Sequence, residues 1–273
     1  MTVAVDLGGQ VAVVTGGGGG IGAGISIALA AAGAHVIVAE IDAGRANHTV
    51  GAIVDAGGQA DAAVVDIRER ADVERLASET LATHDHVDIL VNNVGHYLRV
   101  TPFLAGDEDH WDALDTVNLR HVLRCTRAFA PSMVERGSGA IVNVSSVEAL
   151  RGYPADPVYG AYKAAVAHFT RCLALELAPH GVRVNAIAPD VTQSIQIDYS
   201  TVPEELADRW PIWVPVGRVG EPADNADVVL FLVSELSRFM VGQVIPTDGG
   251  TLDAGGWFRT VRAGRWTNRP RNP

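Results

Sequence analysis

The sequence has few of the features that mark membrane-spanning, secreted or nucleic-acid-binding proteins. No run of about 18 apolar residues occurs in the chain, so a membrane span is not expected. Residues 1–10 lack a basic stretch followed by an apolar core, which argues against a secretion signal and predicts a cytoplasmic protein. The net charge of −11 argues against nucleic-acid binding, because that function needs a basic surface to meet phosphates.

Cysteine is also scarce, and the spacings typical of metal sites are missing. Cys125 and Cys172 both lie in apolar stretches with a helical pattern, so we expect two small buried side chains rather than a disulfide or metal site. The nine histidines show no HxxxH spacing and no evident cluster with cysteine. The sequence therefore predicts no protein-bound metal.

Apolar, β-branched segments alternate with helical patterns, and a hydrophobic content of 48% supports a substantial core. A helix is expected over residues 111–135, with Pro131 as a candidate break. Strands that are apolar on both faces and separated by helices predict a parallel sheet covered on both sides. We therefore predict an α/β, doubly wound domain over residues 1–250, followed by a C-terminal extension over residues 251–273. The predicted strands are residues 10–15, 34–40, 59–67, 87–93, 139–146, 182–189 and 242–250.

The stretch TGGGGGIG, Thr15–Gly22, joins a predicted strand to a predicted helix. A glycine-rich turn in that place presents backbone N–H groups and the positive end of a helix dipole to an anion. This context favours a phosphate-binding loop over a flexible linker, the other common use of a glycine run. Glu40 ends the next strand, where a carboxylate accepts hydrogen bonds from an adenine-side ribose and repels a 2′-phosphate. With no basic residue following Glu40, these features predict NAD(H).

Polar residues stand at the ends of later predicted strands as well. Asp66 and Ile67 end the third strand, Asn92–Gly95 the fourth, and Ser145 and Ser146 the fifth. In a parallel sheet, ligands bind beyond the carboxyl ends of the strands, so these residues are expected on one rim. Each alone is also a common helix cap or turn former, and only their combination favours a binding site.

Tyr159 and Lys163 are four residues apart in a predicted helix and therefore share one of its faces. Tyr162 is offset around the helix and is expected to point elsewhere. An ammonium beside a phenol favours the phenolate and lowers a pKa that is ordinarily about 10. Tyr159 is thus a candidate general acid/base, although the pair taken alone also fits an ordinary exposed helix surface.

Together these motifs resemble the classical short-chain dehydrogenase/reductase family. The resemblance extends from about Leu7 to Gly250, and it implies a Rossmann-like fold with a seven-stranded parallel sheet. It also implies a catalytic tetrad in which serine bonds the substrate oxygen and tyrosine exchanges its proton. Lysine binds the nicotinamide ribose and lowers the tyrosine pKa, and asparagine holds a proton-relay water. The tetrad residues matched here are Asn118, Ser146, Tyr159 and Lys163.

By the same resemblance, Gly16, Gly20 and Gly22 are the motif glycines, whereas residues 17–19 fill variable positions. Gly19 stands where many NADP-using relatives have arginine. Asp190 replaces the glycine that usually follows proline after the sixth strand, which places a carboxylate near the expected nicotinamide pocket. The residues expected to contact NAD are Gly16, Gly19, Gly20, Ile21, Gly22, Glu40, Asp66, Ile67, Asn93, Val94, Gly95, Tyr159, Lys163, Pro189, Thr192 and Ser194.

These assignments predict an NAD(H)-dependent oxidoreductase that interconverts a secondary alcohol and a ketone. The segment Val191–Val216 carries Tyr199, Trp210 and Trp213, and a mobile aromatic lid suits a bulky apolar or cyclic substrate. Packing of these rings in the core or at a subunit contact is the alternative. The expected substrate-side residues are His96, Glu148, Leu150, Tyr153, Trp210 and Trp213.

Two other functions fit the sequence less well. Reduction of 3-oxoacyl groups on a carrier would favour NADPH and a basic docking surface, and both Glu40 and the net charge of −11 argue against them. A dinucleotide-sensing regulatory or scaffold protein is the second alternative, but such a protein has no need of a complete tetrad.

The C-terminal extension carries three large aromatic residues, Trp257, Phe258 and Trp266, among five arginines. Disordered tails are usually poor in aromatics, so we expect docking rather than a free end. The family resemblance implies a homotetramer in which C-terminal strands of two subunits lie close together. The tail is therefore predicted to cover an active-site mouth or subunit contact, with a solvated tail as the alternative.

Overall fold

Seven parallel strands form the centre of the structure, a computed structural model in which residues 5–256, 258–259 and 266–267 are described. Their order is β3-β2-β1-β4-β5-β6-β7, so the chain builds one half of the sheet outward from β1 and then the other half. This order confirms the predicted doubly wound fold. The strands are β1 (Val11–Thr15), β2 (His35–Glu40), β3 (Gln59–Val64), β4 (Ile89–Asn92), β5 (Gly139–Val144), β6 (Val182–Pro189) and β7 (Val244–Thr247).

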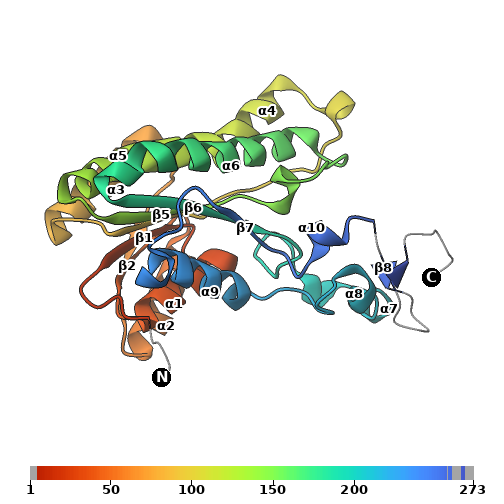
Figure 1. The fold of residues 1–273 in the computed structure, drawn as a ribbon, viewed down its shortest axis with the longest axis horizontal. Coiled ribbons are helices and arrows are strands. Elements are labelled where there is room, and N and C mark those ends of the chain that lie inside the picture. The colour runs from red at the N-terminus through yellow and green to blue at the C-terminus, as the bar shows by residue number, and fades with distance from the viewer. Residues whose placement is uncertain (1–4, 257, 260–265, 268–273) are drawn as a thin grey trace.

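Helices cover both faces of the sheet and give the molecule three layers (Figure 1). One face carries α1 (Gly20–Ala31), α2 (Ala43–Asp55) and α9 (Pro222–Val233). The other face carries α3 (Arg70–His84), α5 (His121–Arg136) and α6 (Pro157–Leu177), and α4 (Glu108–Asp115) extends beyond it.

The central strand β1 shows why the sheet is buried on both sides. Ala12 and Val14 pack in the core under α1 and α9, whereas Val11 and Val13 pack in the core under α3 and α5. Successive side chains of a strand point to opposite faces, so an unbroken apolar run fills two cores at once. Full burial of each such valine stabilises the fold by about 1.5–3 kcal/mol.

The helical region over residues 108–136 is interrupted, but not at Pro131. One π-helical turn, Thr116–Arg120, separates α4 from α5. Pro131 lies inside α5, so the break expected there was wrong. Burial of Phe129 and Met133 on either side of Pro131 holds the helix to the sheet and outweighs the lost hydrogen bond, which costs about 3 kcal/mol.

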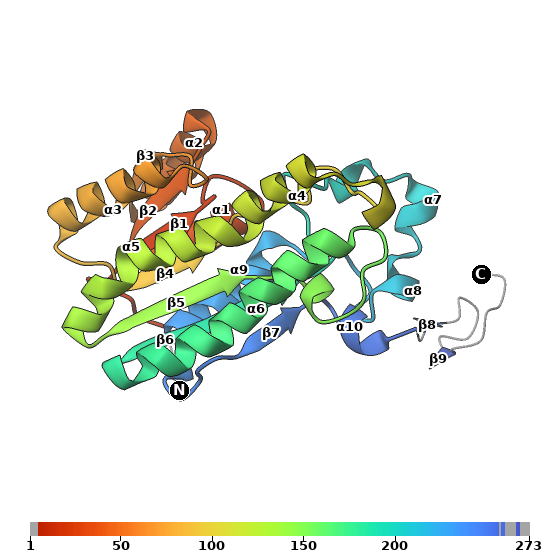
Figure 2. The ribbon, with the colours of Figure 1, turned by 90° about the horizontal axis from the view of Figure 1, so that it is seen from above.

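Three short helices lie beyond the carboxyl ends of the strands (Figure 2): α7 (Glu204–Ala207), α8 (Trp210–Trp213) and α10 (Thr251–Ala254). Two short strands, β8 (Phe258–Arg259) and β9 (Trp266–Thr267), form a separate antiparallel pair, and β8 lies beside α8. Trp257, one of the proposed anchors of the tail, lies outside the described residues.

The two cysteines differ from each other in exposure. Cys125 is buried in α5, as expected, but Cys172 is exposed on α6, so the expectation of burial was wrong for it. The Sγ atom of Cys172 lies 3.5 Å from Nε2 of His168, one helical turn earlier, a histidine–cysteine spacing that the sequence analysis missed.

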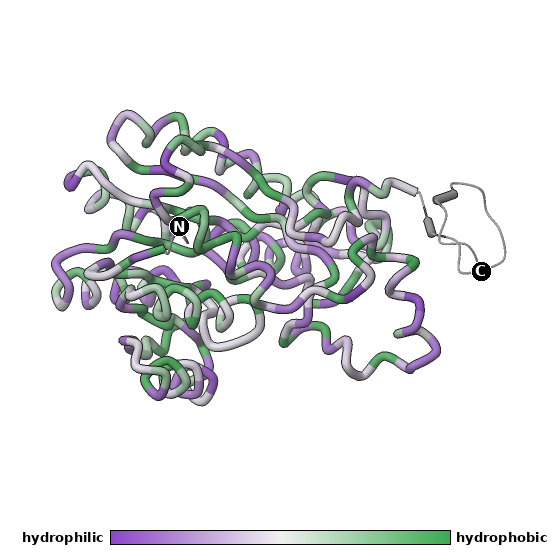
Figure 3. Tube along the Cα trace, turned by 60° about the horizontal axis from the view of Figure 1, so that its bottom comes forward, coloured by the Kyte–Doolittle hydropathy of each residue, from purple (hydrophilic) through white to green (hydrophobic). Residues whose placement is uncertain are grey.

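Hydrophobic and hydrophilic residues alternate over short distances along the trace (Figure 3). Within the described part of the chain, no helix is both long enough and apolar enough to cross a membrane.

Candidate active site

A cavity of about 550 Å³ opens at the carboxyl ends of the central strands. Its lining comes from the residues that follow β1, β2, β3, β4, β5 and β6, which the fold brings to one rim. Every residue that the sequence predicted to contact the dinucleotide lines this cavity. The strand ends identified in the sequence therefore form one continuous surface.

The glycine loop between β1 and α1 forms one wall, and most of its glycines leave no room for a side chain, as Gly22 and Gly18 illustrate. A Cβ atom on Gly22 would collide with the carbonyl oxygen of Gly16. A Cβ atom on Gly18 would lie 2.7 Å from Cγ of Glu40. Gly18 was expected to fill a variable position, but packing against β2 and α2 fixes it as firmly as the motif glycines.

The amino end of α1 fits the phosphate group of a dinucleotide. Its N-cap is Gly19, which offers no side-chain cap to the first N–H groups of the helix, and no acidic residue lies in the first turn. Gly19 and Gly20 both line the cavity. Uncapped N–H groups and the helix dipole thus face the space where an anion is expected.

Glu40 is held in place at the end of β2. Its side chain is only 5% exposed, Oε2 accepts a hydrogen bond from the Gly18 N–H (3.2 Å), and Oε1 accepts one from the Ile41 N–H (3.0 Å). Arg45 completes the site, because its Nη2 donates to Oε1 at 2.8 Å. The carboxylate is therefore a fixed acceptor on the cavity wall.

No basic residue directly follows Glu40, but Arg45, five residues further on, reaches its carboxylate. Arg45 lies in the first turn of α2, and the short connection after β2 brings its guanidinium back to the carboxylate. Arg45 also lines the cavity, and its buried Nε has no hydrogen-bond partner among the described residues. A positive charge thus lies beside Glu40, whose carboxylate was expected to repel a 2′-phosphate without a compensating charge nearby.

Asp66 and Asn93 occupy neighbouring parts of the rim. The carboxylate of Asp66 accepts two short bonds from Arg68, Nε to Oδ1 (2.9 Å) and Nη2 to Oδ2 (2.7 Å), and these bonds lower the pKa of Asp66. Asn93 Nδ2 donates to the carbonyl oxygens of Thr15 (3.0 Å) and Gly16 (3.3 Å). Asn93 therefore ties the end of β4 to the glycine loop.

Ser146, Tyr159 and Lys163 converge at the far end of the same cavity. Ser146 follows β5, whereas Tyr159 and Lys163 lie one turn apart on α6. The buried N-cap Asp156 accepts a hydrogen bond from the Tyr159 N–H (3.1 Å) and so fixes the start of that helix. As predicted, Tyr162 does not line the cavity, and its electrostatic partners are on the α4–α5 side.

Lys163 is the only lysine in the chain, and it is buried. Its Nζ donates to the Val144 carbonyl oxygen (3.1 Å) and lies 5.9 Å from the ring centroid of Tyr159. Burial lowers the pKa of Lys163 to about 8. Its own main-chain carbonyl accepts a hydrogen bond from Ser145 Oγ (2.8 Å), which connects this turn of α6 to β5.

The predicted lowering of the Tyr159 pKa is not observed in this arrangement. Burial raises the pKa of Tyr159 well above its ordinary value, and a hydrogen bond with Ser146 offsets only part of that rise. The reason is that the phenol and the ammonium share a desolvated site, which favours the neutral form of each. Tyr159 therefore keeps its proton at neutral pH.

Asn118 lies in the π-helical turn and is buried. Its Nδ2 donates to the carbonyl oxygens of His96 (2.8 Å) and Leu114 (3.0 Å), and its Oδ1 accepts from the His96 N–H (3.0 Å). Both amide protons are thus used by the backbone. Oδ1 accepts only one of these bonds and can accept a second. The two bonds with His96 fix the loop after β4.

On the substrate side, the structure brings together only some of the predicted residues. His96, Glu148 and Tyr153 line the cavity, whereas Leu150, Trp210 and Trp213 do not. The last two were expected in an aromatic lid. Trp210 instead packs edge-on against Tyr199 (ring centroids 5.4 Å apart), and Trp213 is largely exposed. Their positions follow from short helices whose packing no local pattern indicates.

Tyrosine rings surround the phenol of Tyr159. Tyr97 and Tyr153 stand edge-on to Tyr159, with ring centroids 6.4 Å and 6.3 Å from its own, and Tyr199 lines the same space. The substrate side is therefore aromatic close to Tyr159.

The unusual Asp190 has a structural account. Its Oδ2 accepts bonds from Arg151 Nη2 (2.9 Å) and Thr251 Oγ1 (2.6 Å), and Oδ1 accepts from the Val191 N–H (2.9 Å). The same Arg151 Nη2 donates to Glu148 Oε1 at 2.8 Å. A carboxylate–guanidinium–carboxylate group thus joins three chain segments at the edge of the cavity, and Arg151 was not among the residues found from the sequence.

Two segments of the substrate side have strained backbone. Leu98 has a φ of 55° and Val191 a φ of 31°, both in the left-handed region that bulky side chains rarely adopt. Gln196 Nε2 donates to the Gly95 carbonyl oxygen, and Tyr97 Oη donates to the Gln196 carbonyl oxygen (3.4 Å). The segment after β6 therefore closes over the loop after β4.

Known proteins resemble this chain in sequence and in structure. A family model described as enoyl-(acyl carrier protein) reductase matches residues 16–251. A 3-oxoacyl-(acyl-carrier-protein) reductase of Thermotoga maritima is 34% identical over 246 residues, which cover 90% of this chain and 99% of the relative.

Two solved structures share the arrangement at a TM-score of 0.85. A 7α-hydroxysteroid dehydrogenase in complex with NADH and 7-oxo glycochenodeoxycholic acid is 33% identical, and the match covers 90% of this chain and 96% of that one. A protein from Beutenbergia cavernae described as an NAD(P)-dependent gluconate 5-dehydrogenase, with bound NADP, is 35% identical over 92% of this chain and 100% of its own.

Proposed function

The chain belongs to the short-chain dehydrogenase/reductase family of oxidoreductases, and we propose that it interconverts a secondary alcohol and a ketone with NAD(H). The observation that carries the proposal is the convergence of Ser146, Tyr159 and Lys163 on the cavity that the glycine loop and Glu40 also line. A non-catalytic dinucleotide sensor has no need of that convergence.

The side chains divide the chemistry among themselves. A bound nicotinamide cofactor supplies or accepts the hydride. Ser146 holds the substrate oxygen, and the protonated phenol of Tyr159 donates its proton to that oxygen as the ketone is reduced. Lys163 stabilises the phenolate that then forms, and proton transfer between a secondary alcohol and this phenolate reverses the step. Asn118 positions the loop after β4 and offers Oδ1 to a relay water.

The substrate we infer is a bulky alcohol with a ring or other broad apolar face. Tyr97, Tyr153 and Tyr199 supply aromatic surface near Tyr159, and the group of Arg151, Glu148 and Asp190 supplies a charged edge. Such a pocket suits an apolar body with one polar end. The relative that bears a hydroxysteroid name supports this substrate class.

A panel assay tests the proposal. Hydroxysteroids, cyclic alcohols and polyols are offered with NAD⁺ or NADP⁺, and the matching ketones with the reduced cofactors, while absorbance of reduced nicotinamide is followed. We expect turnover of at least one cyclic alcohol–ketone pair. No turnover of any alcohol or ketone in either direction would contradict the proposal.

NAD(H) is proposed as the preferred cofactor because Glu40 is a fixed carboxylate on the cavity wall. Like-charge contact with a 2′-phosphate and lost ribose hydrogen bonds each cost on the order of 1–3 kcal/mol. Arg45 offsets part of this cost. We therefore expect kcat/KM to favour NAD⁺ by about tenfold or more, and Arg45→Ala to widen that ratio. Equal kcat/KM values for NAD⁺ and NADP⁺ would show that Glu40 does not bind the adenine-side ribose.

A second candidate function, reduction of a carrier-bound 3-oxoacyl group, is favoured by one local feature. A hollow of about 610 Å³ between α3 and α5 is lined by four arginines, Arg70, Arg120, Arg124 and Arg127. The net charge of −11 was taken to argue against a basic docking surface, but net charge does not describe how charges are distributed. Faster reduction of a 3-oxoacyl thioester with NADPH than of any ketone in the panel would favour this function.

A further inference from the structure

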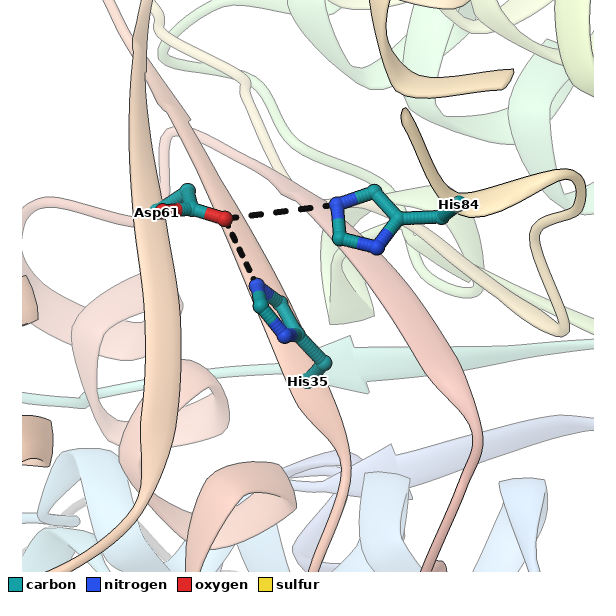
Figure 4. A group of neighbouring side chains, drawn as sticks. All are labelled: His35, Asp61 and His84. Atoms are coloured by element: carbon teal, nitrogen blue, oxygen red, sulfur yellow. Dashed lines mark hydrogen bonds and ion pairs between the residues drawn. The ribbon is translucent and has the colours of Figure 1, made fainter. Parts of the chain in front are cut away.

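We propose that His35, Asp61 and His84 form a binding site for a divalent transition-metal cation at the amino end of the sheet (Figure 4). One ligand atom from each side chain lies within 4.8 Å of the others. Two imidazoles and a carboxylate are the ligands that Zn²⁺ and its neighbours among the metals take in proteins. The sequence predicted no metal site, because these residues are far apart in the chain.

The fold brings the three residues together from three elements. His35 begins β2, and Asp61 lies in β3 opposite Ile37, two residues further along β2. Residues two apart on a strand point to the same face, so His35 and Asp61 share a face of the sheet. That face is covered by α3, whose last residue is His84, and Figure 4 shows the three side chains converging.

The present distances are close to those a metal requires. His35 Nε2 lies 2.7 Å from Asp61 Oδ2, a hydrogen-bond distance, and His84 Nε2 lies 4.0 Å from the same oxygen. Ligands at about 2.1 Å from a tetrahedral ion are separated by about 3.4 Å. The two gaps to Asp61 therefore have to change by less than about 1 Å, which its exposed side chain permits (62% exposed). The gap between the two histidines is at most 4.8 Å and has to close by no more than about 1.4 Å.

The electrostatic surroundings favour a cation there. His84 ends α3, and the residue after it takes a left-handed conformation, so the negative end of the helix dipole points at the site. His86, two residues after His84, lies against Asp88 instead of the cluster, and Asp88 also forms an ion pair with Arg136.

A bound ion would connect the edge of the sheet to its covering helix. β3 is an edge strand, and Asp61 is the exposed member of the group. His35 and Glu40 occupy opposite ends of β2, so the metal would lie about 17 Å from the cofactor cavity. The ion would therefore stabilise the folded chain rather than take part in hydride transfer.

Zn²⁺ binding to the tag-free full chain, measured by competition with a chromophoric chelator, tests the proposal. The background variant is His168→Gln/Cys172→Ser, which removes the exposed histidine–cysteine pair on α6. We expect this background to bind one Zn²⁺ and to unfold at a higher temperature when Zn²⁺ is present.

Zn²⁺ binding should weaken by at least about tenfold in each of the single variants His35→Gln, Asp61→Asn and His84→Gln. Loss of a residue that only hydrogen-bonds to a metal ligand already weakens metal binding by about that much. The three variants should also abolish the thermal shift. His48→Gln, which removes an exposed histidine of α2, should change neither quantity. Asp61→Asn alters an exposed side chain and so preserves folding. Unchanged Zn²⁺ affinity in the three variants, or no binding by the background, would overturn the proposal.

Discussion

The dinucleotide half and the substrate half of the cavity are built in different ways. The dinucleotide half consists of strand ends and a glycine loop, where backbone groups approach so closely that a side chain on Gly22 or Gly18 has no room. The substrate half consists of long connections held by side chains, such as Gln196 on Gly95 and Arg151 on Asp190. Positive φ angles outside glycine occur there at Leu98 and Val191.

This difference indicates which half of the cavity changes shape when a single residue is replaced. Backbone packing in a sheet fixes positions regardless of most side-chain changes, whereas a segment held by a few ion pairs changes shape when one residue is replaced. We infer that the dinucleotide half is common to the family and that the substrate half adapts it to a particular alcohol. The following changes test how far the two halves are independent.

Tyr159→Phe should give the largest effect, because it removes the proton carrier at the point where the two halves meet. Turnover should fall by about 10²-fold or more, while NADH still binds, since the ring and the dinucleotide half are intact. Steady-state kinetics and NADH fluorescence titration measure the two quantities. Tyr162→Phe, three residues on and outside the cavity, is the matched control, and near-normal turnover in Tyr159→Phe would remove Tyr159 from the mechanism.

The buried Lys163 should make stability depend on pH in the alkaline range. Its pKa is about 8 in the folded chain against an ordinary 10.5, so between these values the unfolded chain binds more protons. The free energy of unfolding should therefore rise by about 2 kcal/mol from pH 8 to pH 10, relative to Lys163→Met. Denaturant unfolding of both proteins at several pH values measures this difference.

Because Lys163 is the only lysine, selective ¹³C-lysine labelling gives its titration directly by NMR. A midpoint near pH 8 is expected. A midpoint near the ordinary value, together with parallel stability profiles for the two proteins, would show that the ammonium is not desolvated.

Asp190→Asn should affect the substrate half alone. The variant keeps the acceptor for the Val191 N–H but removes the charge that holds Arg151. Since Arg151 is partly exposed, we expect a two- to fivefold rise in the substrate KM (about 0.4–1 kcal/mol), with little change in the NAD⁺ KM. Glu74→Gln, which breaks an exposed pair on α3, is the control. An equal change in both KM values would show that the halves are coupled.

Truncation after Asp253 should give the smallest effect. That the tail docks near an active-site mouth stays a prediction: β8 lies beside α8, and α8 does not line the cavity. Removing the tail should change the substrate KM or weaken the homotetramer that the family resemblance implies, as measured by kinetics and sizing chromatography. If kinetics and assembly are both unchanged, the tail has neither role.

The halves also differ in what the sequence predicted. The sheet was predicted from apolar strand segments that alternate with helical segments, and the glycine loop from a run of glycines. The residues at the strand ends were predicted from polar residues that follow apolar stretches. All of these are local patterns. Tyr159 and Lys163 were identified by helical spacing and by resemblance together. All of these features depend on residues close together in the chain or on the regular geometry of a parallel sheet.

The errors arose where the outcome depends on packing or on the geometry of a turn, which local sequence patterns do not show. Trp210 and Trp213 were placed in the substrate pocket, but the packing of two short helices directs them elsewhere. Arg45 was overlooked because its ion pair with Glu40 depends on the turn after β2. The pKa of Tyr159 was predicted from its neighbour alone, although burial, which only the folded chain defines, has the larger effect.

Deuterium transfer tests the central claim most directly. The ketone that the panel identifies is reduced with NADH carrying deuterium at C4 on either face, and the product is analysed by mass spectrometry and NMR. We predict that one of the two labelled cofactors places a single deuterium on the carbinol carbon and that Tyr159→Phe forms this product at least about 10²-fold more slowly. A product without deuterium from both cofactors, or an unchanged rate in Tyr159→Phe, would contradict hydride transfer assisted by Tyr159.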